Sequence, residues 1–147
     1  MNASVRPWNQ PPIVRLAQLA IGLVLLVSAL GKLGDVAWFA QQVHNYRLLP
    51  GWAENALAIV LPWVELTAGL ALVVGPRAPA GARIALALMV VFTVAVGLAW
   101  ARGLDFRCGC FGKADASTIG ASKFAENVGL TLLAWLAARR PREPERG

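Results

Sequence analysis

The chain has 147 residues, of which 57% are hydrophobic and only 15% are charged, and its mean hydropathy is +0.56. Soluble domains carry a charge at roughly a quarter of their positions, so this composition argues against a water-soluble globular protein. The net charge of +6 fits arginines beside membrane segments, where they anchor helices and meet anionic lipid, and does not indicate nucleic-acid binding.

The apolar residues gather in long blocks that are almost free of charge, which predicts helices that cross a membrane. About 20 such residues span the hydrocarbon layer of roughly 30 Å, and soluble proteins seldom need so many in one run. We expect an all-α integral membrane protein, with four spanning helices bundled into one domain over residues 1–147. The expected spans are 13–33, 56–75, 84–101 and 119–138, followed by a disordered basic tail at 139–147.

The first and last of these spans need separate arguments. A cleaved signal peptide would share the basic start and apolar run of the first span, but the run continues into Gly31-Lys32-Leu33 without a persuasive cleavage site, so a retained helix is favoured. The first turns of the fourth span carry Lys123, Glu126 and Asn127. In a bilayer those side chains must face protein or water.

Residues 35–54, between the first two spans, mix aromatic, apolar and polar side chains. This mixture is typical of a short helix that lies on the membrane surface, here closed by Pro50-Gly51. His44 and Tyr46 within it are interpreted as interfacial packing rather than as catalytic groups. A tight turn is expected at 76–81, which contains two prolines and one arginine.

Positive charge sets the expected orientation. The termini and the second loop together hold eight of the 14 basic residues, and the opposite side holds six. This bias favours cytoplasmic termini, because cytoplasmic loops are enriched in lysine and arginine. The surface helix and the cysteines would then lie on the outer face. The first group is Arg6, Arg15, Arg77, Arg83, Arg139, Arg140, Arg142 and Arg146, and the second is Lys32, Arg47, Arg102, Arg107, Lys113 and Lys123.

Cys108 and Cys110, the only cysteines, stand one residue apart behind the third span. They can close a disulfide only through a small ring, for which Gly109 supplies the backbone freedom. Arg107 and Lys113 would stabilise nearby thiolates, the form that attacks a disulfide. A redox-active pair is therefore the leading interpretation.

Two other roles for the cysteine pair stay open. A structural disulfide would close so short a loop that it removes little entropy from the unfolded chain. Two sulfurs could also hold a soft ion such as Cu(I), but a closed zinc site needs four ligands and His44 is the only histidine. No metal site is therefore assigned.

Glu65 would lie deep in the second span, about 14 Å from a start near Ala56 at 1.5 Å per residue. An unpaired carboxylate there is costly, so we expect it to be protonated, to pair with a group such as Lys32, or to face a water-filled cavity. It would serve either as a proton acceptor coupled to thiol oxidation or as a polar clamp between helices.

Four segments, in this order, resemble the methylamine-utilisation MauE family, within the wider DoxX-like membrane proteins. The resemblance covers about Leu16 to Leu136, and its most specific part is the Cys-Gly-Cys-Phe-Gly signature behind three hydrophobic spans. The segments are Gly31-Lys32-Leu33 with Asp35, Tyr46-Arg47-Leu48-Leu49-Pro50, Leu61-Pro62-Trp63-Val64-Glu65-Leu66 and Cys108-Gly109-Cys110-Phe111-Gly112.

The resemblance implies a four-helix inner-membrane protein that assists disulfide formation or maturation of an exported, disulfide-containing client. In the methylamine system that client is the small subunit of methylamine dehydrogenase, and a thioredoxin-like protein often works alongside. Cys108 and Cys110 match the family's cysteine pair, and Glu65, Lys32 and Asp35 match its polar membrane-edge positions. A quinone in the bilayer is a candidate electron acceptor for such a thiol–disulfide oxidoreductase.

Two other classes of function compete with the redox relay. A binding or assembly factor would hold an exported client without redox turnover, and it would tolerate replacement of both cysteines. A small transporter would line its path with Glu65 and Lys32, but four short spans with so few intramembrane charges disfavour it.

Overall fold

The computed structural model describes residues 11–75, 77–111 and 116–139. In these ranges the chain is all-α, with a single isolated bridge between Arg107 and Thr118 as its extended pairing. The basic tail expected at 139–147 falls outside the described residues beyond Arg139, as does Lys113. The helices are α1 (Pro12–Leu33), α2 (Val36–Asn45), α3 (Gly51–Val74), α4 (Ala78–Ala101) and α5 (Ala121–Ala138).

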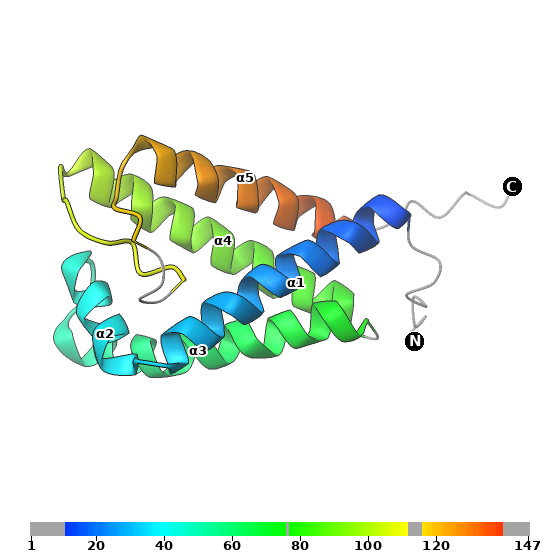
Figure 1. The fold of residues 1–147 in the computed structure, drawn as a ribbon, viewed down its shortest axis with the longest axis horizontal. Coiled ribbons are helices and arrows are strands. Elements are labelled where there is room, and N and C mark those ends of the chain that lie inside the picture. The colour runs from blue at the N-terminus through cyan, green and yellow to red at the C-terminus, as the bar shows by residue number, and fades with distance from the viewer. Residues whose placement is uncertain (1–10, 76, 112–115, 140–147) are drawn as a thin grey trace, which may run out of the picture.

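The four long helices pack side by side, and the short α2 lies across one end of them (Figure 1). Helix α1 packs against α3 and α5, α4 packs against the same two helices, and α2 packs mainly against α3. The start of α1, the α3–α4 turn and the end of α5 lie at one end, while α2 and the segment between α4 and α5 lie at the other (Figure 1). The start of α1, the α3–α4 turn and the end of α5 therefore share one end of the molecule, as the expected orientation requires.

Three helices, α1, α3 and α4, are long and apolar enough to cross a membrane, which supports the prediction of a membrane protein. Helix α5 is not among them. It has 18 residues, and Lys123, Glu126 and Asn127 interrupt its apolar character near the start. Buried Lys123 and Asn127 face protein, as the bilayer argument required, whereas Glu126 is 44% exposed and pairs with Lys123 at 3.2 Å.

The short helix expected within residues 35–54 is present as α2, but Pro50-Gly51 does not close it. Helix α2 ends at Asn45, and Pro50 is instead the N-cap of α3, which starts at Gly51 rather than near Ala56. Proline suits this position because it has no N–H that would need a partner. The second turn is also shorter than 76–81, since α4 already begins at Ala78. Glu65 thus lies about 21 Å from the start of its helix.

Small residues allow α1 and α3 to pack closely. A β-carbon on Gly22 would meet the Gly69 carbonyl oxygen at 3.1 Å, and one on Gly69 would meet the Gly22 carbonyl oxygen at 3.0 Å. At the end of this contact, Arg15 of α1 donates to the carbonyl oxygens of Leu72 and Val73 at 2.7 and 2.8 Å. These carbonyls belong to the last turn of α3, which has no intrahelical partners for them. The same contact brings Lys32 and Glu65 together further along.

Candidate functional site

The segment that follows α4 folds back over the end of the helices and carries a disulfide between Cys108 and Cys110, whose Cα atoms lie 5.4 Å apart. Cys108 N donates to Ser117 O at 3.1 Å, and Ile119 N donates to Phe106 O at 3.0 Å. These bonds tie the two arms of the segment together around the disulfide. We call residues 104–111 the cysteine loop.

Gly109 has the backbone freedom that the sequence suggested it would need. Its φ is +72°, in the left-handed region that favours glycine, and a β-carbon there would lie 2.9 Å from the side chain of Gln42 on α2. The cysteine loop is therefore seated directly on α2.

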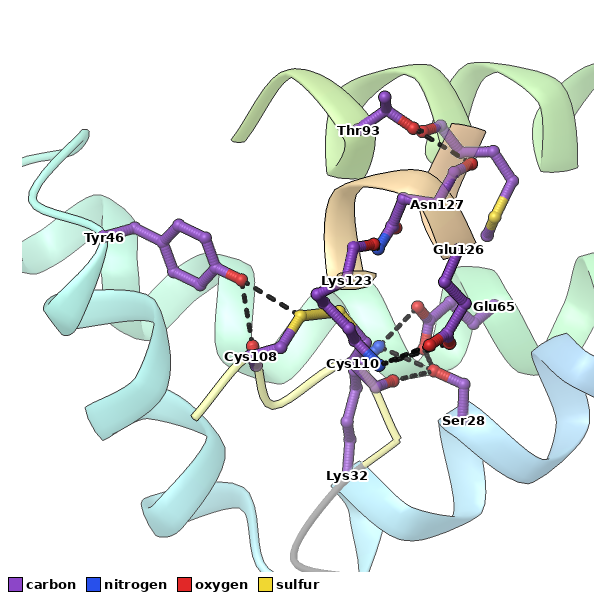
Figure 2. The surroundings of a disulfide bond; sticks show 11 residues. Ser28, Lys32, Tyr46, Glu65, Thr93, Cys108, Cys110, Lys123, Glu126 and Asn127 are labelled. Atoms are coloured by element: carbon purple, nitrogen blue, oxygen red, sulfur yellow. Dashed lines mark hydrogen bonds and ion pairs between the residues drawn. A yellow bond between two sulfur atoms is a disulfide. The ribbon is translucent and has the colours of Figure 1, made fainter. Parts of the chain in front are cut away.

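The two sulfurs differ in exposure and in their surroundings. Cys108 is only 2% exposed and packs with Val96, Ala99 and Ile119, whereas Cys110 is partly exposed. The Tyr46 hydroxyl donates to the Cys108 carbonyl oxygen at 3.0 Å and lies 3.3 Å from Cys108 Sγ (Figure 2). A thiolate formed at Cys108 would lie within reach of this hydroxyl, whose single proton would turn from the carbonyl oxygen to the sulfur. A reagent from outside would reach Cys110 first.

Tyr46 is the functional candidate that the sequence interpretation missed, because it was assigned to interfacial packing. Its ring packs edge-on against Phe106 at 4.7 Å between centroids, and Arg102 at the end of α4 donates to its carbonyl oxygen at 3.1 Å. These contacts fix the hydroxyl beside Cys108. The available signal was its place in the Tyr-Arg-Leu-Leu-Pro segment, which the family resemblance singled out.

Lys32 and Glu65 form a buried ion pair between α1 and α3. Lys32 Nζ lies 2.6 Å from Glu65 Oε1, and the two side chains are 1% and 0% exposed. Pairing with Lys32 was one of the three arrangements expected for a carboxyl at this depth. The ammonium also lies over the Phe39 and Phe92 rings, at 5.1 and 4.9 Å from their centroids. Cation–π attraction therefore adds to the pairing.

Ser28 joins the ion pair to the cysteine loop. Its hydroxyl accepts from Lys32 Nζ at 2.8 Å, lies 3.3 Å from Glu65 Oε2 and donates to the Cys110 carbonyl oxygen (Figure 2). Ser28 stands one helical turn before Lys32 on α1, so both side chains share one face. The pair and the disulfide thus belong to one polar cluster, made of Ser28, Lys32, Glu65 and the cysteine loop.

Asp35 and Arg107 were also expected to support the site, and both make structural contacts near it. Asp35 is the N-cap of α2, where its carboxylate accepts from Trp38 N at 2.9 Å. Arg107 is exposed and takes part in the bridge to Thr118. Asp35 also contacts Lys32 through the backbone, where its N–H donates to the Lys32 carbonyl oxygen at 3.3 Å.

A cavity of about 230 Å³ lies against the disulfide. The cysteine loop forms one wall, and side chains of α1, α2, α3 and α4 form the others, among them Lys32, Tyr46 and Phe92. We call it the disulfide cavity. Within the part of the chain that the structure describes, no three histidine, cysteine, aspartate or glutamate side chains gather as they would around a metal ion.

The chain is similar to known proteins over most of its length. A family model described as methylamine utilisation protein MauE matches residues 10–140. The methylamine utilization protein MauE of Paracoccus denitrificans is 35% identical over 126 residues, which cover 85% of this chain and 68% of the relative. The protein of the same name from Methylorubrum extorquens is 34% identical over 137 residues, with 90% and 74% covered.

A third protein of that name, from Methylophilus methylotrophus, is 37% identical over 103 residues, which cover 69% of this chain and 54% of the relative. No solved structure matches the chain significantly. The family match extends from the start of α1 to the end of α5 and includes the cysteine loop, Lys32 and Glu65. The chain therefore belongs to the methylamine utilisation MauE family.

Proposed function

We propose that this protein exchanges a disulfide with an exported client in methylamine utilisation, using Cys108 and Cys110. The observation that carries the proposal is the asymmetry of the pair: a partly exposed Cys110 beside a buried Cys108 whose sulfur lies 3.3 Å from the Tyr46 hydroxyl. Exchange needs one accessible sulfur and one good leaving group, and a stabilised thiolate leaves faster.

The proposed reaction moves two electrons from the client to the pair. A client thiolate attacks Cys110 Sγ, the Cys108–Cys110 bond breaks, and Cys108 leaves as a thiolate that accepts a hydrogen bond from Tyr46. A second client thiolate then attacks the client sulfur of the mixed disulfide. This step releases Cys110 and leaves the client with a disulfide and the pair reduced.

The proposal includes an arrangement in the membrane. We place the protein in a bacterial inner membrane, with α5 as the fourth span, the termini in the cytoplasm and the cysteine loop on the outer face. The positive-charge bias supports this orientation. Helix α2 and the cysteine loop lie at the same end of the long helices, so this orientation puts the whole site on the outer face. The proposed client is the small subunit of methylamine dehydrogenase, with a thioredoxin-like protein as a second partner.

Single-cysteine variants test the asymmetry. Cys108→Ser leaves an accessible Cys110, whose thiolate should attack the disulfide of the oxidised client and hold it as a mixed disulfide while the second client sulfur leaves as a thiolate. Cys110→Ser leaves a buried cysteine that should trap little. Both variants remove little buried surface, so the helices should stay folded. The measurement is the amount of mixed disulfide on non-reducing gels after acid quenching. Equal trapping by the two variants, or more by Cys110→Ser, would contradict the assigned roles.

Alkylation in intact cells tests the orientation. After mild reduction, a membrane-impermeant thiol reagent should label the wild-type pair from outside. Labelling that requires access from the cytoplasm would contradict the proposed topology. Client maturation that continues unchanged in the double-serine variant would eliminate the relay and favour a binding factor.

A further inference from the structure

The disulfide cavity has a polar inner end and an apolar mouth. Leu48, Leu49, Leu57 and Val91 line the cavity, yet they are 45, 43, 37 and 61% exposed. Two of them lie on α3 and α4, which are long and apolar enough to cross a membrane. Exposed apolar side chains on such helices face acyl chains, so a ligand of this cavity enters from the bilayer rather than from water.

The inner end presents a cation between aromatic rings. Lys32, Phe39 and Phe92 all line the cavity, and the Lys32 ammonium lies 5.1 and 4.9 Å from the two ring centroids. Of its three N–H groups, one donates to Ser28 and one to Glu65. Among the described residues, the third has no hydrogen-bond acceptor. A ligand with a carbonyl oxygen at this end would accept from it.

The disulfide itself lines the same cavity, through Cys108, Gly109 and Cys110. A ligand in the cavity therefore lies beside the group whose reoxidation the proposed function leaves open. Each turnover reduces the pair, and the next needs an acceptor for two electrons and two protons. The acceptor must be apolar enough to come from lipid and must carry a hydrogen-bond acceptor for Lys32.

We propose that the disulfide cavity binds the ring of a lipid-soluble quinone, which reoxidises the cysteine pair; this inference rests on the proposed thiol–disulfide exchange. One ring carbonyl accepts from Lys32 Nζ, the Phe39 and Phe92 rings flank the headgroup, and the tail leaves through the apolar mouth. A volume of about 230 Å³ suits a ring whose tail stays in lipid better than a whole drug-sized ligand.

The redox step balances within these groups. The two thiols lose two electrons and two protons as the Cys108–Cys110 bond forms, and the quinone gains them and becomes a quinol. An acyl chain in the cavity would leave the third N–H of Lys32 without an acceptor and would accept no electrons. A phosphate headgroup would be mismatched with the leucine-lined mouth.

Neighbouring positions on α4 provide matched variants. Ala95 lines the cavity, while Val94 is 54% exposed and does not line it, so Ala95→Phe fills the site and Val94→Phe adds the same ring outside. Val91→Trp at the mouth and Val90→Trp beside it form a second pair at exposed positions, where a large side chain does not threaten folding.

The experiment uses the full chain in detergent micelles, with decylubiquinone as the probe and decanol as the control for an acyl chain. Three quantities are measured for each variant without oxygen: the rise in Tm of the oxidised protein on adding probe, the rate at which probe oxidises the reduced pair, and the rate at which dithiothreitol reduces the disulfide. The first needs no redox activity, because a ligand that binds only the folded state raises Tm.

We expect decylubiquinone, and not decanol, to raise Tm and to oxidise the pair in wild type, Val94→Phe and Val90→Trp. Ala95→Phe and Val91→Trp should lose the rise in Tm and react at least about tenfold more slowly, which corresponds to about 1.4 kcal/mol of lost binding free energy. All five proteins should react alike with dithiothreitol. That last rate shows that the filled cavity has not disturbed the disulfide.

Different failures separate the two proposals. A pair that dithiothreitol cannot reduce contradicts the proposed exchange, and the Tm arm then still decides the binding site. A pair that exchanges with dithiothreitol but is not oxidised by decylubiquinone overturns the quinone assignment alone. Equal oxidation in Ala95→Phe and Val94→Phe overturns the cavity as its location. A rise in Tm with decanol as large as with decylubiquinone assigns the cavity to acyl chains and overturns the proposal.

Discussion

Removing one partner of the Lys32–Glu65 pair should destabilise the protein far more than removing both. The two side chains are 1% and 0% exposed, with Nζ and Oε1 2.6 Å apart. Glu65→Leu leaves a buried ammonium with Ser28 as its remaining hydrogen-bond partner. Breaking a buried pair from one side costs about 3–5 kcal/mol, whereas replacing both partners by apolar residues of similar size is often neutral or stabilising.

The expected loss in the free energy of unfolding is therefore about 3–5 kcal/mol for Glu65→Leu and near zero for the double variant Lys32→Met/Glu65→Leu. The Lys123–Glu126 pair serves as a control, because its carboxylate is 44% exposed and lies 3.2 Å from the amine. Glu126→Gln should cost less than Glu65→Leu, because the glutamine carbonyl oxygen can still accept a hydrogen bond from Lys123, which is itself only 2% exposed.

The assay is reversible unfolding in micelles with a rising fraction of denaturing detergent, followed by circular dichroism. Recovery of stability in the double variant is the critical result, because it separates the cost of a stranded charge from the cost of lost packing. If Glu65→Leu lowered stability no more than Glu126→Gln, or if the double variant were no more stable than the single one, the buried-charge argument would be wrong.

Three further variants probe the site. If the Glu65 carboxyl takes up a proton, Glu65→Gln should lower the rate at which the cysteine pair is oxidised per folded molecule. If Glu65 is only a polar clamp between helices, the variant should lower Tm and leave that rate unchanged. The rate and Tm are measured on the same sample. Tyr46→Phe should slow reduction of the disulfide by a client dithiol about tenfold, because the Cys108 thiolate loses a charge-assisted hydrogen bond worth about 1.5 kcal/mol. The rate is measured by stopped flow, and an unchanged rate would refute the role of Tyr46. Gly109→Ala should destabilise the folded cysteine loop and speed its proteolysis more than Gly103→Ala does. Both glycines have a positive φ, but only a β-carbon at Gly109 would meet a side chain of α2. Equal effects of the two variants would mean that backbone strain alone is the cause.

The sequence predicted the main helices because long apolar runs report directly on membrane spans, and it placed their ends less well. The start of α3 was set near Ala56, where the apolar run begins, although Pro50 and Glu54 carry the usual signals of a helix start. Apolarity reports where lipid begins, whereas capping reports where the helix begins, and α3 starts before its apolar run does. The polar residues of α5 were expected to face protein or water, and Lys123 and Asn127 do face protein.

The candidate site was only partly predictable, because its key contacts join distant segments. Depth in the membrane sufficed to suggest that Glu65 pairs with Lys32, since an unpaired carboxylate there is costly. Nothing local links Tyr46 to Cys108, which is 62 residues away. Asp35 stands before a short helix, a position that also indicates an N-cap, and its carboxylate does cap α2. Its supporting role at the site stays a prediction.

The arrangement of donors in the polar cluster explains why the ion pair and the cysteine loop occur together. The Ser28 hydroxyl has one proton, so it donates either to Glu65 or to the Cys110 carbonyl oxygen. Lys32 donates to both Glu65 and Ser28. Because the carboxylate already accepts a hydrogen bond from Lys32, the Ser28 proton is left to bond the carbonyl oxygen of the cysteine loop. Loss of the lysine would turn that proton toward the carboxylate and release the loop. We therefore expect the charge pair to help hold the backbone beside the more accessible sulfur.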